Sequence, residues 1–432
     1  MELKRAYKYR IYPTKPQRIM LAEWEAQLRW LWNLANEQRV SFAKRTRADR
    51  AKAFEQGIKP PDYFSQSKEM TSLVAEDARL AAVPSCVRQE ILRDLEKAWQ
   101  RFRKGLGGKP HFKRRNDAMR AYAPDKTGWS LTMPDGRFGS IRFRGIGNVQ
   151  ARIDRPLEGV ASSCILVRDV GRSVNEHEWY AIILCTSTIH DPAPSKLPPV
   201  AINRGVHVLA ATSEGILHEN PRFYEKKMDL LARRQRQAAR KAPLPGQPAS
   251  KNYLKALHRV ARLHQKTRRQ RAHVIECLSK QLVEHHGLVA IEAYDTKGML
   301  EKKIEDKPAF VSRAVHRGIA DSAWGMLGIK ITNKSVPLGV RVEKFSPVDK
   351  SRKCNKCGHV DEASMRGREF RCTKCGHEDH IDVNHAKNGL EDALAAANSP
   401  PAAPKTRKKT SIPGRRKASA TSGPLPDADS GG

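Results

Sequence analysis

The sequence predicts a multidomain α+β protein. At 432 residues the chain exceeds the roughly 250 residues at which single hydrophobic cores stop growing, so we expect more than one folding unit. Apolar residues have helical spacing in residues 15–105, and short strand-like runs replace that spacing in residues 107–189. Two Cys-x-x-Cys pairs near the C-terminal end predict a further small unit built around a metal.

The first strand is predicted at residues 2–12, ELKRAYKYRIY, where basic and apolar side chains alternate with a period of two. This alternation is typical of a half-buried strand and places Lys4, Lys8 and Arg10 on one side. Gly, Pro and Asp turns between short apolar runs in residues 107–189 predict a small antiparallel sheet or barrel. We expect the first strand to join it.

A proline-dense segment at 191–199 predicts a domain boundary. Beyond it, residues 201–215 predict two short strands around a turn, and Asn203 ends the first. A short apolar run at 287–294 predicts a buried strand with Glu292 near its C-terminal end. The other predicted elements are two long basic helices at 222–241 and 251–286, helical spacing at 310–327, a strand at 339–345, a helix from Asp382, and a disordered basic tail at 398–432.

The charge balance points to a polyanionic partner. Lys and Arg number 80 against 46 Asp and Glu, which gives a net charge of +34. No stretch approaches the roughly 18 apolar residues of a membrane-spanning helix, so we expect a cytoplasmic, nucleoid-associated protein that binds nucleic acid. Candidate contact residues are Lys8, Arg10, Lys113, Arg114, Arg233 and Arg234. For Lys113, Arg114, Arg233 and Arg234 the alternative is an ordinary solvated charged face.

Four cysteines have the spacing of a zinc ribbon. Cys354 and Cys357 form one Cys-x-x-Cys pair, and Cys372 and Cys375 form the second after a 14-residue spacer. Four thiolates complete a tetrahedral shell with no open position for water, so the predicted zinc is structural. The alternative is a set of free thiols in a flexible loop.

Two acidic residues stand at positions typical of a metal-dependent nuclease. Glu292 lies near the end of a predicted buried strand, and Asp382 begins a predicted helix. Nucleases of the RNase H type hold divalent cations with carboxylates on adjacent strands and a helix, because hard cations prefer oxygen ligands. Asp382 could equally be a simple helix N-cap, so the spacing alone leaves both interpretations open.

Several longer segments occur together in a fixed order. They are YKYRIYPTKPQ, VPSCVRQEILRDLEKAWQRF followed by GKPHFKRR, AINRGVHVLAATSEG, VAIEAYDTKGML, HRGIADSAWGML, and the cysteine quartet followed by DVNHAKNGL. In these segments, which span nearly the whole ordered chain, the sequence resembles the TnpB family of transposon-encoded RNA-guided nucleases. TnpB proteins are relatives of the compact type V CRISPR effectors.

The resemblance implies a domain organisation and partners. The implied domains are a wedge-type β-barrel at 1–14 and 106–190, a helical recognition lobe at 15–105, an RNase H-like RuvC domain at 200–350 and 378–397, and a zinc ribbon at 351–377. The implied partners are a guide RNA and a double-stranded DNA target that carries a short flanking motif. The implied cofactors are the structural zinc and Mg²⁺ at the RuvC site.

The family's three metal-binding acids fall on Asn203, Glu292 and Asp382, so this chain has an amide at the first position. Two further departures surround the third position: Ile381 where relatives often have Arg, and His385 where a small Ala is usual. An amide lacks the negative charge of a carboxylate, so we expect weaker Mg²⁺ binding and cleavage that is lost or strongly reduced.

Three functional interpretations remain open from the sequence. The first is an RNA-guided DNA-binding protein that no longer cuts and acts as a repressor. The second is an active or weakly active endonuclease associated with a transposon, in which Glu214, Asp295, Asp379 or a water replaces the missing acid. The third is a zinc-ribbon adaptor that binds nucleic acid without a guide.

Overall fold

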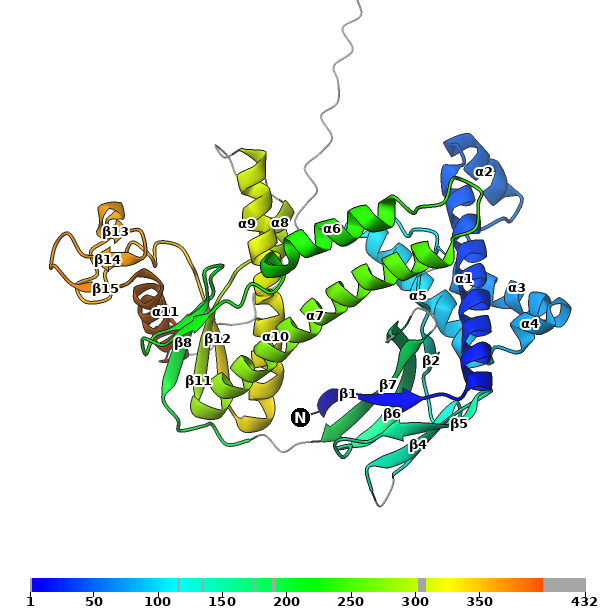
Figure 1. The fold of residues 1–432 in the computed structure, drawn as a ribbon, viewed down its shortest axis with the longest axis horizontal. Coiled ribbons are helices and arrows are strands. Elements are labelled where there is room, and N and C mark those ends of the chain that lie inside the picture. Colours follow the sequence, from blue (N-terminus) through cyan, green and yellow to red (C-terminus); the bar gives the residue numbers. More distant parts are fainter. Residues whose placement is uncertain are drawn as a thin grey trace, which may run out of the picture.

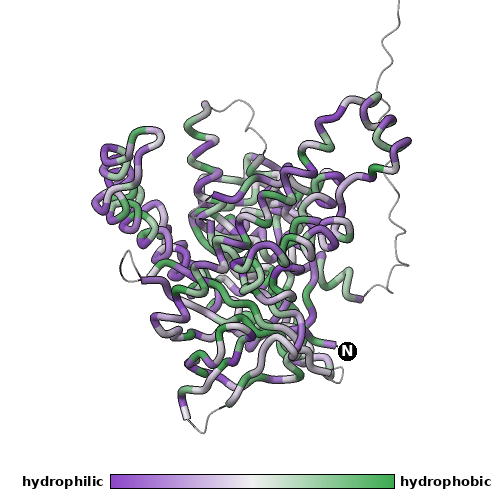
Figure 2. Tube along the Cα trace, turned by 90° about the vertical axis from the view of Figure 1, so that its right-hand side faces the viewer, coloured by the Kyte–Doolittle hydropathy of each residue, from purple (hydrophilic) through white to green (hydrophobic). Residues whose placement is uncertain are grey.

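The structure, a computed structural model, describes residues 2–114, 117–133, 136–171, 173, 176–188, 192–301 and 308–398. A group of helices and two sheets lie side by side, and a small cysteine-rich unit projects at the far end (Figure 1). The disordered tail predicted at 398–432 falls outside the described residues except for Asn398. Hydrophobic segments gather toward the middle of the molecule (Figure 2).

Helices fill the N-terminal region in which helical spacing was predicted. They are α1 (Lys15–Lys44), α2 (Arg47–Glu55), α3 (Tyr63–Glu76), α4 (Ala78–Ala81) and α5 (Ser85–Arg103). Helix α1 buries Trp24, and α5 buries Val87 and Leu95, because residues three or four apart share one helix face. These side chains belong to the same hydrophobic core as the first sheet.

The first sheet has seven antiparallel strands in the order β2-β6-β7-β1-β5-β4-β3. Its strands are β1 (Glu2–Tyr12), β2 (Ala121–Ala123), β3 (Trp129–Thr132), β4 (Phe138–Phe143), β5 (Gly147–Arg152), β6 (Val160–Val170) and β7 (His177–Thr188). As predicted, the first strand joins it, between β7 and β5. A Cβ on Gly128 would lie 2.9 Å from Ala123 Cβ, so the two end strands approach each other and the sheet is nearly a barrel.

The second sheet has the order β10-β9-β8-β11-β12. Its strands are β8 (Pro199–Asn203), β9 (Val208–Thr212), β10 (Leu217–Glu219), β11 (Leu288–Glu292) and β12 (Arg341–Phe345). The first three follow one another antiparallel, and β11 and β12 are added parallel to β8. This arrangement is that of the RNase H-like fold predicted from the sequence.

Helices cover both faces of the second sheet. Helices α7 (Lys251–His285) and α10 (Trp324–Ser335) pack on the face that carries Ile202 and Ile291. Helix α11 (Ile381–Asn398) packs on the face that carries Ala201 and Ala290. Because strand side chains alternate between faces, the residues two positions further along, Asn203 and Glu292, also face α11.

The helical spacing predicted at 310–327 is interrupted in the structure. Helix α9 (Ala309–Ser322) ends where α10 begins, and Ala323 between them has φ 53° and ψ 40°, in the left-handed region. Alanine favours helix in isolation, so helical spacing alone does not indicate this break, which tertiary packing holds in place. The break places the Trp324 carbonyl at the edge of the second sheet, where it accepts a hydrogen bond from Arg204.

Helices α6 (Met228–Ala239) and α7 correspond to the two predicted basic helices. Helix α7 runs from the second sheet toward the N-terminal helices and passes the first sheet on the way (Figure 1). A short helix, α8 (Thr296–Glu301), follows β11. None of the helices in the described part of the chain is long and apolar enough to cross a membrane.

Candidate active site and metal centre

The three site positions predicted from the sequence lie together at one edge of the second sheet. Asn203 ends β8 and Glu292 ends β11, and the parallel register of these strands places their carboxyl ends side by side. Asp382 lies in the first turn of α11, which covers the same face. Asn203 is 7% exposed and Glu292 is 2% exposed, so both are removed from bulk water.

Asp382 accepts hydrogen bonds on both carboxylate oxygens. Asn203 Nδ2 donates to Oδ1 at 3.0 Å, and Arg368 Nη1 donates to Oδ2 at 3.1 Å. The amide thus presents its N–H₂ group, and not a metal-binding oxygen, to the acid. The guanidinium of Arg368 offsets the negative charge of Asp382.

Glu292 is held by Arg204, the residue after Asn203. The Arg204 backbone N–H donates to Oε1 at 2.9 Å, and its side-chain Nε donates to Oε2 at 3.0 Å. The same guanidinium lies over the Tyr294 ring, 5.4 Å from its centroid. Burial raises the pKa of Glu292 to about 7, although the nearby Arg204 opposes that shift. Arg204 therefore provides the charge partner that this buried carboxylate requires.

His385 and Ile381, the other two departures from the family pattern, lie on either side of Asp382 along α11. His385 Nε2 is 3.9 Å from Glu292 Oε1, and Nδ1 is 3.0 Å from Ser351 Oγ. Burial lowers the pKa of His385 to about 4, so its imidazole is neutral near pH 7. Ile381 packs against the hydrophobic core of the cysteine-rich unit around Phe370.

The three acids considered as substitutes for the missing carboxylate have other partners. Glu214 pairs with His286 at 3.2 Å, beside the start of β11 and therefore at the opposite end of the strands from Glu292. Asp295 accepts from the Gly298 backbone N–H. Asp379 pairs with Lys387 at 2.6 Å. Each of these acids is accounted for by local structure.

The residues at this edge do not fit a pair of Mg²⁺ ions. Two divalent cations need several oxygen ligands with net negative charge. Here the two carboxylates, Glu292 and Asp382, are matched by the guanidiniums of Arg204 and Arg368, and the third position donates N–H. The cluster is close to neutral without any metal, so a dication adds uncompensated charge.

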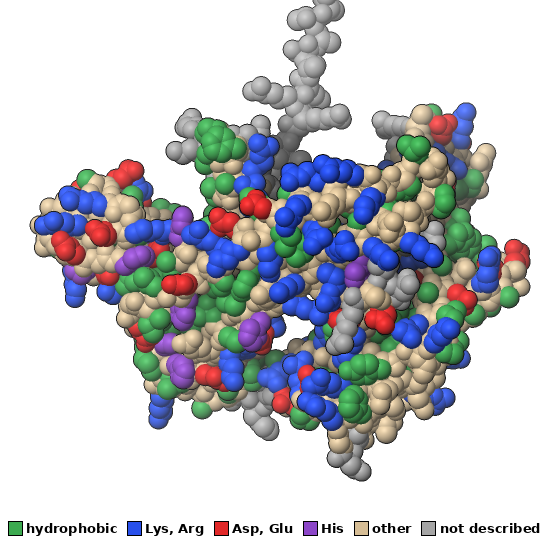
Figure 3. All heavy atoms as spheres, in the orientation of Figure 1, with side chains coloured by type: hydrophobic (Ala, Val, Ile, Leu, Met, Phe, Trp, Pro, Cys, Tyr) green, Lys and Arg blue, Asp and Glu red, His purple; other side chains and the backbone are tan. Residues whose placement is uncertain are grey.

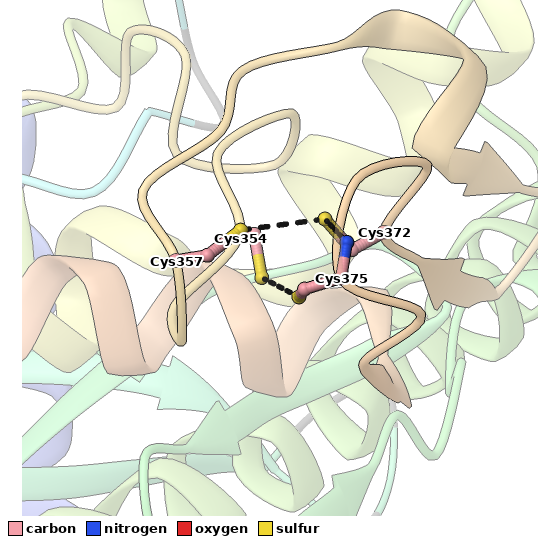
Figure 4. A group of neighbouring side chains, drawn as sticks. All are labelled: Cys354, Cys357, Cys372 and Cys375. Atoms are coloured by element: carbon pink, nitrogen blue, oxygen red, sulfur yellow. Dashed lines mark hydrogen bonds between the residues drawn. The ribbon is translucent and has the colours of Figure 1, made fainter.

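The four cysteines of the predicted zinc ribbon converge. Their sulfur atoms all lie within 4.8 Å of one another. Cys354 and Cys375 are 3.7 Å apart at Sγ, and Cys357 and Cys372 are 3.6 Å apart (Figure 4). A tetrahedral zinc with Zn–S bonds of about 2.3 Å needs sulfur separations of roughly 3.8 Å. The donor set and its size thus fit one zinc ion.

Each cysteine pair sits in a tight turn that directs backbone N–H groups at sulfur. Lys356 N–H donates to Cys354 Sγ, and Cys375 N–H donates to Cys372 Sγ. The second contact lowers the pKa of Cys372, which favours the thiolate that a metal binds. Gly358 and Gly376 follow the pairs with φ 71°, a left-handed conformation that favours glycine.

The cysteine-rich unit is fixed to α11 by two asparagines. Asn384 Nδ2 and Asn388 Nδ2 both donate to the Lys353 carbonyl, at 2.8 and 2.7 Å. Its small sheet consists of β13 (Met365–Arg366), β14 (Glu369–Arg371) and β15 (Glu378–His380). Arg368 lies in the turn between β13 and β14, and this docking brings it to Asp382.

The basic residues predicted to contact nucleic acid lie on three separate elements. Lys8 and Arg10 are on β1, and Lys8 Nζ lies 3.9 Å from the Tyr180 ring centroid. Lys113 and Arg114 follow α5, where Lys113 Nζ lies 4.8 Å from the Trp32 ring centroid. Arg233 and Arg234 are on α6, and Arg233 is exposed.

A polar joint between α7 and the first sheet was missed by sequence reasoning. Glu178 forms an ion pair with Arg10 at 2.8 Å and another with Arg269 of α7. Asp169 pairs with Arg268 at 2.6 Å. A cavity of about 660 Å³ beside the joint is lined by Arg268, among others. Lys and Arg side chains gather over α6 and α7 and around the hollow between α7 and the first sheet (Figure 3).

Comparisons with known proteins place these features in a family. A protein of Streptomyces pristinaespiralis named "Putative RNA-guided DNA endonuclease" is 30% identical over 405 residues, which cover 92% of this chain and 91% of that protein. The chain belongs to the TnpB family of RNA-guided DNA endonucleases. A second TnpB-type relative, InsQ of Escherichia coli K12, named in the same way, is 26% identical and covers 90% of this chain and 92% of its own length.

Family models match three stretches of this TnpB-family chain. Residues 183–303 match a probable transposase family, OrfB_IS605, and residues 324–388 match the Cas12f1-like TNB domain. Residues 1–45 match a model described as a helix-turn-helix domain, although here they form β1 and α1.

A solved complex of Cas12f1 with its single-guide RNA and target DNA shares the fold. The two chains are 13% identical with a TM-score of 0.51, over 90% of this chain and 98% of the other. At this identity the likeness concerns the fold alone, and it agrees with the architecture predicted from the sequence.

Proposed function

We propose that the protein is an RNA-guided double-stranded DNA-binding protein that holds its target without cutting it, and that it acts as a guided repressor. The observation that carries the proposal is the Asn203–Asp382 hydrogen bond at the edge where a family nuclease has its first metal-binding acid. Family membership supports the guided binding, and the chemistry of this edge supports the loss of cutting.

Guided binding needs little from the protein beyond positive charge and shape. The guide RNA pairs with one DNA strand, and a basic channel holds the resulting A-form heteroduplex by its phosphates. The net charge of +34 and the concentration of Lys and Arg over α6 and α7 support this role (Figure 3). The protein itself reads only a short flanking motif on the DNA.

Loss of one carboxylate has a large electrostatic effect. A unit charge about 4 Å from a dication contributes roughly 8 kcal/mol at an effective dielectric of 20, and about 2 kcal/mol in water. Even the lower figure weakens metal binding more than tenfold. Arg204 and Arg368 reduce the remaining negative potential further, because each pairs with one of the two retained acids.

Repression follows from a bound complex that persists. A guide-paired strand displaces its partner strand and forms an R-loop, which blocks transcription when it lies over a promoter. The four-cysteine ribbon contributes a structural zinc that keeps Arg368 and α11 in place, and it supplies no catalytic water.

The second candidate is an active or weakly active RNA-guided endonuclease. The names of the two relatives and the retention of Glu292 and Asp382 favour it. In that case a water or a rearranged acid completes the metal site. The two candidates differ in one measurable outcome, which is cleavage of a matching DNA.

The test uses the protein purified with its RNA, and sequencing that RNA supplies the guide. A plasmid matching the guide is incubated with the complex in Mg²⁺, and cleavage and binding are measured in parallel. The variants are Asn203→Asp alone and Asn203→Asp combined with Ile381→Arg and His385→Ala. Glu292→Gln in the triple variant is the matched inactive control.

We expect tight, guide-dependent binding and no cutting by the unmodified complex. Clear cutting by the unmodified complex would overturn the proposal in favour of the endonuclease. Recovery of cutting in a revertant, abolished again by Glu292→Gln, would locate the loss at this edge. Protein that carries no discrete RNA would support the third interpretation, a guide-free zinc-ribbon adaptor.

A further inference from the structure

The cavity of about 660 Å³ beside the joint lies between α7, α9 and the end of β6, away from the edge that carries Asn203. Its volume is within the range of roughly 300–1,000 Å³ that is typical of ligand sites. Three guanidinium groups and two carboxylates line it, which leaves one net positive charge. The residues are Arg268, Arg271, Arg317, Asp169 and Asp321, and Tyr224 adds an aromatic ring.

The two acids of the cavity are mostly buried and already paired. The Asp321 side chain is 7% exposed, and it accepts hydrogen bonds from Arg271 Nη2 at 2.5 Å and from the Tyr224 backbone N–H at 2.9 Å. The Asp169 side chain is 14% exposed and pairs with Arg268 at 2.6 Å. Both carboxylates therefore hold the surrounding residues in place and present little free negative charge to a ligand.

The cations of the cavity are more accessible than its acids. The Arg268 side chain is 61% exposed. Arg317 is also exposed, and its guanidinium has no ion pair with an acid within the part of the chain that the structure describes. Lys and Arg side chains also gather over the neighbouring α6 and α7 (Figure 3). An anion that enters the cavity thus meets guanidinium groups first.

Tyr224 stands between this cavity and a smaller one. The second cavity, of about 260 Å³, shares Tyr224, Arg317 and Asp321 with the first and extends to His207 and Arg222. The hydrogen bond from its backbone to Asp321 fixes the position of Tyr224. An aromatic ring at such a place offers a stacking surface, and every nucleic-acid base has a face that can stack on it.

We propose that the larger cavity binds one unpaired nucleotide of a nucleic-acid strand, with its base against Tyr224 and its phosphodiester on Arg268 and Arg317. A phosphodiester carries one negative charge, which matches the net charge of the lining. A free nucleotide ends in a phosphate of nearly two negative charges, which this lining compensates less well. The adjoining 260 Å³ cavity gives a continuous strand a path beyond Tyr224.

Two strands of a guided complex contain unpaired nucleotides. One is the guide RNA outside its paired segment, and the other is the DNA strand that pairing displaces. Both offer the same base and phosphodiester, so the experiment has one arm for each. The site rests on the proposed function in that the chain binds guide RNA and DNA, and it does not depend on whether the protein cuts.

The experiment uses the full-length protein with its ribbon loaded with zinc. The first arm measures the affinity of the chain for its guide RNA, and the second measures the affinity of the assembled complex for matching DNA, both over about 50 to 200 mM salt. The variants are Tyr224→Ala, Tyr224→Phe and Arg317→Gln. Arg313→Gln is the matched control, because Arg313 is exposed one turn earlier on α9 and lines neither cavity. Thermal unfolding checks that each variant is folded.

We expect Tyr224→Ala to weaken binding about fivefold or more in one arm without changing the salt dependence, because a stacked base is lost. Tyr224→Phe keeps the ring and should stay within about twofold of the unmodified protein. Arg317→Gln should make the slope of the logarithm of affinity against the logarithm of salt concentration shallower by about 0.7, the value for one phosphate of a single strand. Arg313→Gln should leave both the affinity and the slope unchanged. The arm that responds identifies the strand.

Unchanged affinity of Tyr224→Ala in both arms would overturn the site, as would a loss in Tyr224→Phe as large as that in Tyr224→Ala. If Tyr224→Ala does not fold, equal slopes for Arg317→Gln and Arg313→Gln would overturn it. Plasmid cleavage by the unmodified complex would overturn the proposed function and leave these comparisons intact. Protein without a guide RNA would also overturn that function, and a short uridine homopolymer would then be the probe in the first arm.

Discussion

Asn203 Nδ2 donates a hydrogen bond to Asp382 Oδ1 across 3.0 Å, from the end of a central strand to the first turn of the last helix. With Asp at position 203, two carboxylates would face each other at this distance, and a cation would be needed between them. With Asn the same two elements are joined by a charge-assisted hydrogen bond. With Asn at position 203, this oxygen of Asp382 is therefore satisfied by a protein group and needs no metal.

Asn203→Asp should lower thermal stability in the absence of divalent cations. The change replaces a hydrogen bond by like-charge repulsion at a buried site, which should cost about 2 kcal/mol. With an unfolding entropy of about 2.1 cal/mol/K per residue, that corresponds to a decrease in Tm of roughly 2 °C for a chain of 432 residues. Thermal unfolding is measured with chelator and with Mg²⁺, and Mg²⁺ should restore part of the loss.

The matched control is Asn388→Asp on the same helix. Asn388 donates to the carbonyls of Lys350 and Lys353, so an acid there removes two hydrogen bonds but faces no second acid of the cluster. Its stability should fall without recovery in Mg²⁺. Equal recovery in both variants would contradict a metal position between residues 203 and 382.

Arg204→Met should destabilise the fold strongly, because it leaves the buried carboxylate of Glu292 without a charge partner. Breaking one side of a buried ion pair costs about 3–5 kcal/mol. The double variant Arg204→Met with Glu292→Gln should recover more than half of that loss, since the unpaired charge is gone. Denaturant unfolding measures each free energy.

Lys4→Met is the control for Arg204→Met, because Lys4 pairs with Glu2 at an exposed position. Its effect should stay below about 0.5 kcal/mol. If the double variant were as unstable as Arg204→Met alone, the loss would come from packing around Tyr294 and Trp324 and not from the charge.

Removal of zinc should release the ribbon from α11. Cys375→Ser leaves three thiolates and should lower bound zinc from one equivalent per chain to a small fraction, as measured by elemental analysis. Limited proteolysis with mass spectrometry should then show new cleavage within residues 351–377. Cys277→Ser, at an exposed cysteine on α7, should change neither result. Unchanged proteolysis after zinc loss would contradict a metal-dependent fold of the ribbon.

The elements that position the site were predictable from local sequence. The short apolar run that forms β11, the strand–turn–strand pattern that forms β8 and β9, and the helix predicted from Asp382, which begins at Ile381 in the structure, all depend on patterns within a few residues. The cysteine quartet was predictable for the same reason, since two short Cys-x-x-Cys turns bring the sulfurs together. These local patterns placed Asn203, Glu292 and Asp382 on three separate elements.

The charge partners within the site could not be predicted in this way. Arg204 is next to Asn203 in sequence, but its partner Glu292 is known only once β8 and β11 are paired. Arg368 reaches Asp382 because the ribbon docks on α11 through Asn384 and Asn388. Both interactions join distant segments, and basic residues in this chain are too numerous for composition to distinguish them.

Arg10 is another residue whose charge partner could not be predicted from the sequence. It was predicted to contact nucleic acid, and in the structure it pairs with Glu178 at 2.8 Å, whereas Arg233 is exposed on α6. Arg233→Ala should therefore weaken binding of an RNA–DNA heteroduplex of about 20 base pairs more than Arg10→Ala does. For a variant that no longer neutralises one phosphate, we expect the plot of the logarithm of the binding constant against the logarithm of salt concentration to have a slope shallower by about 1 than that of the unmodified protein.

Binding is measured for these two variants and for Glu178→Gln over about 50 to 200 mM salt. Glu178→Gln should tighten binding and steepen the slope, because it releases the positive charge of Arg10 and Arg269 toward the phosphates. Arg10→Ala in the Glu178→Gln background should then cost as much affinity as Arg233→Ala. Identical slopes for all variants would mean that neither α6 nor the joint between α7 and the first sheet touches the phosphate backbone.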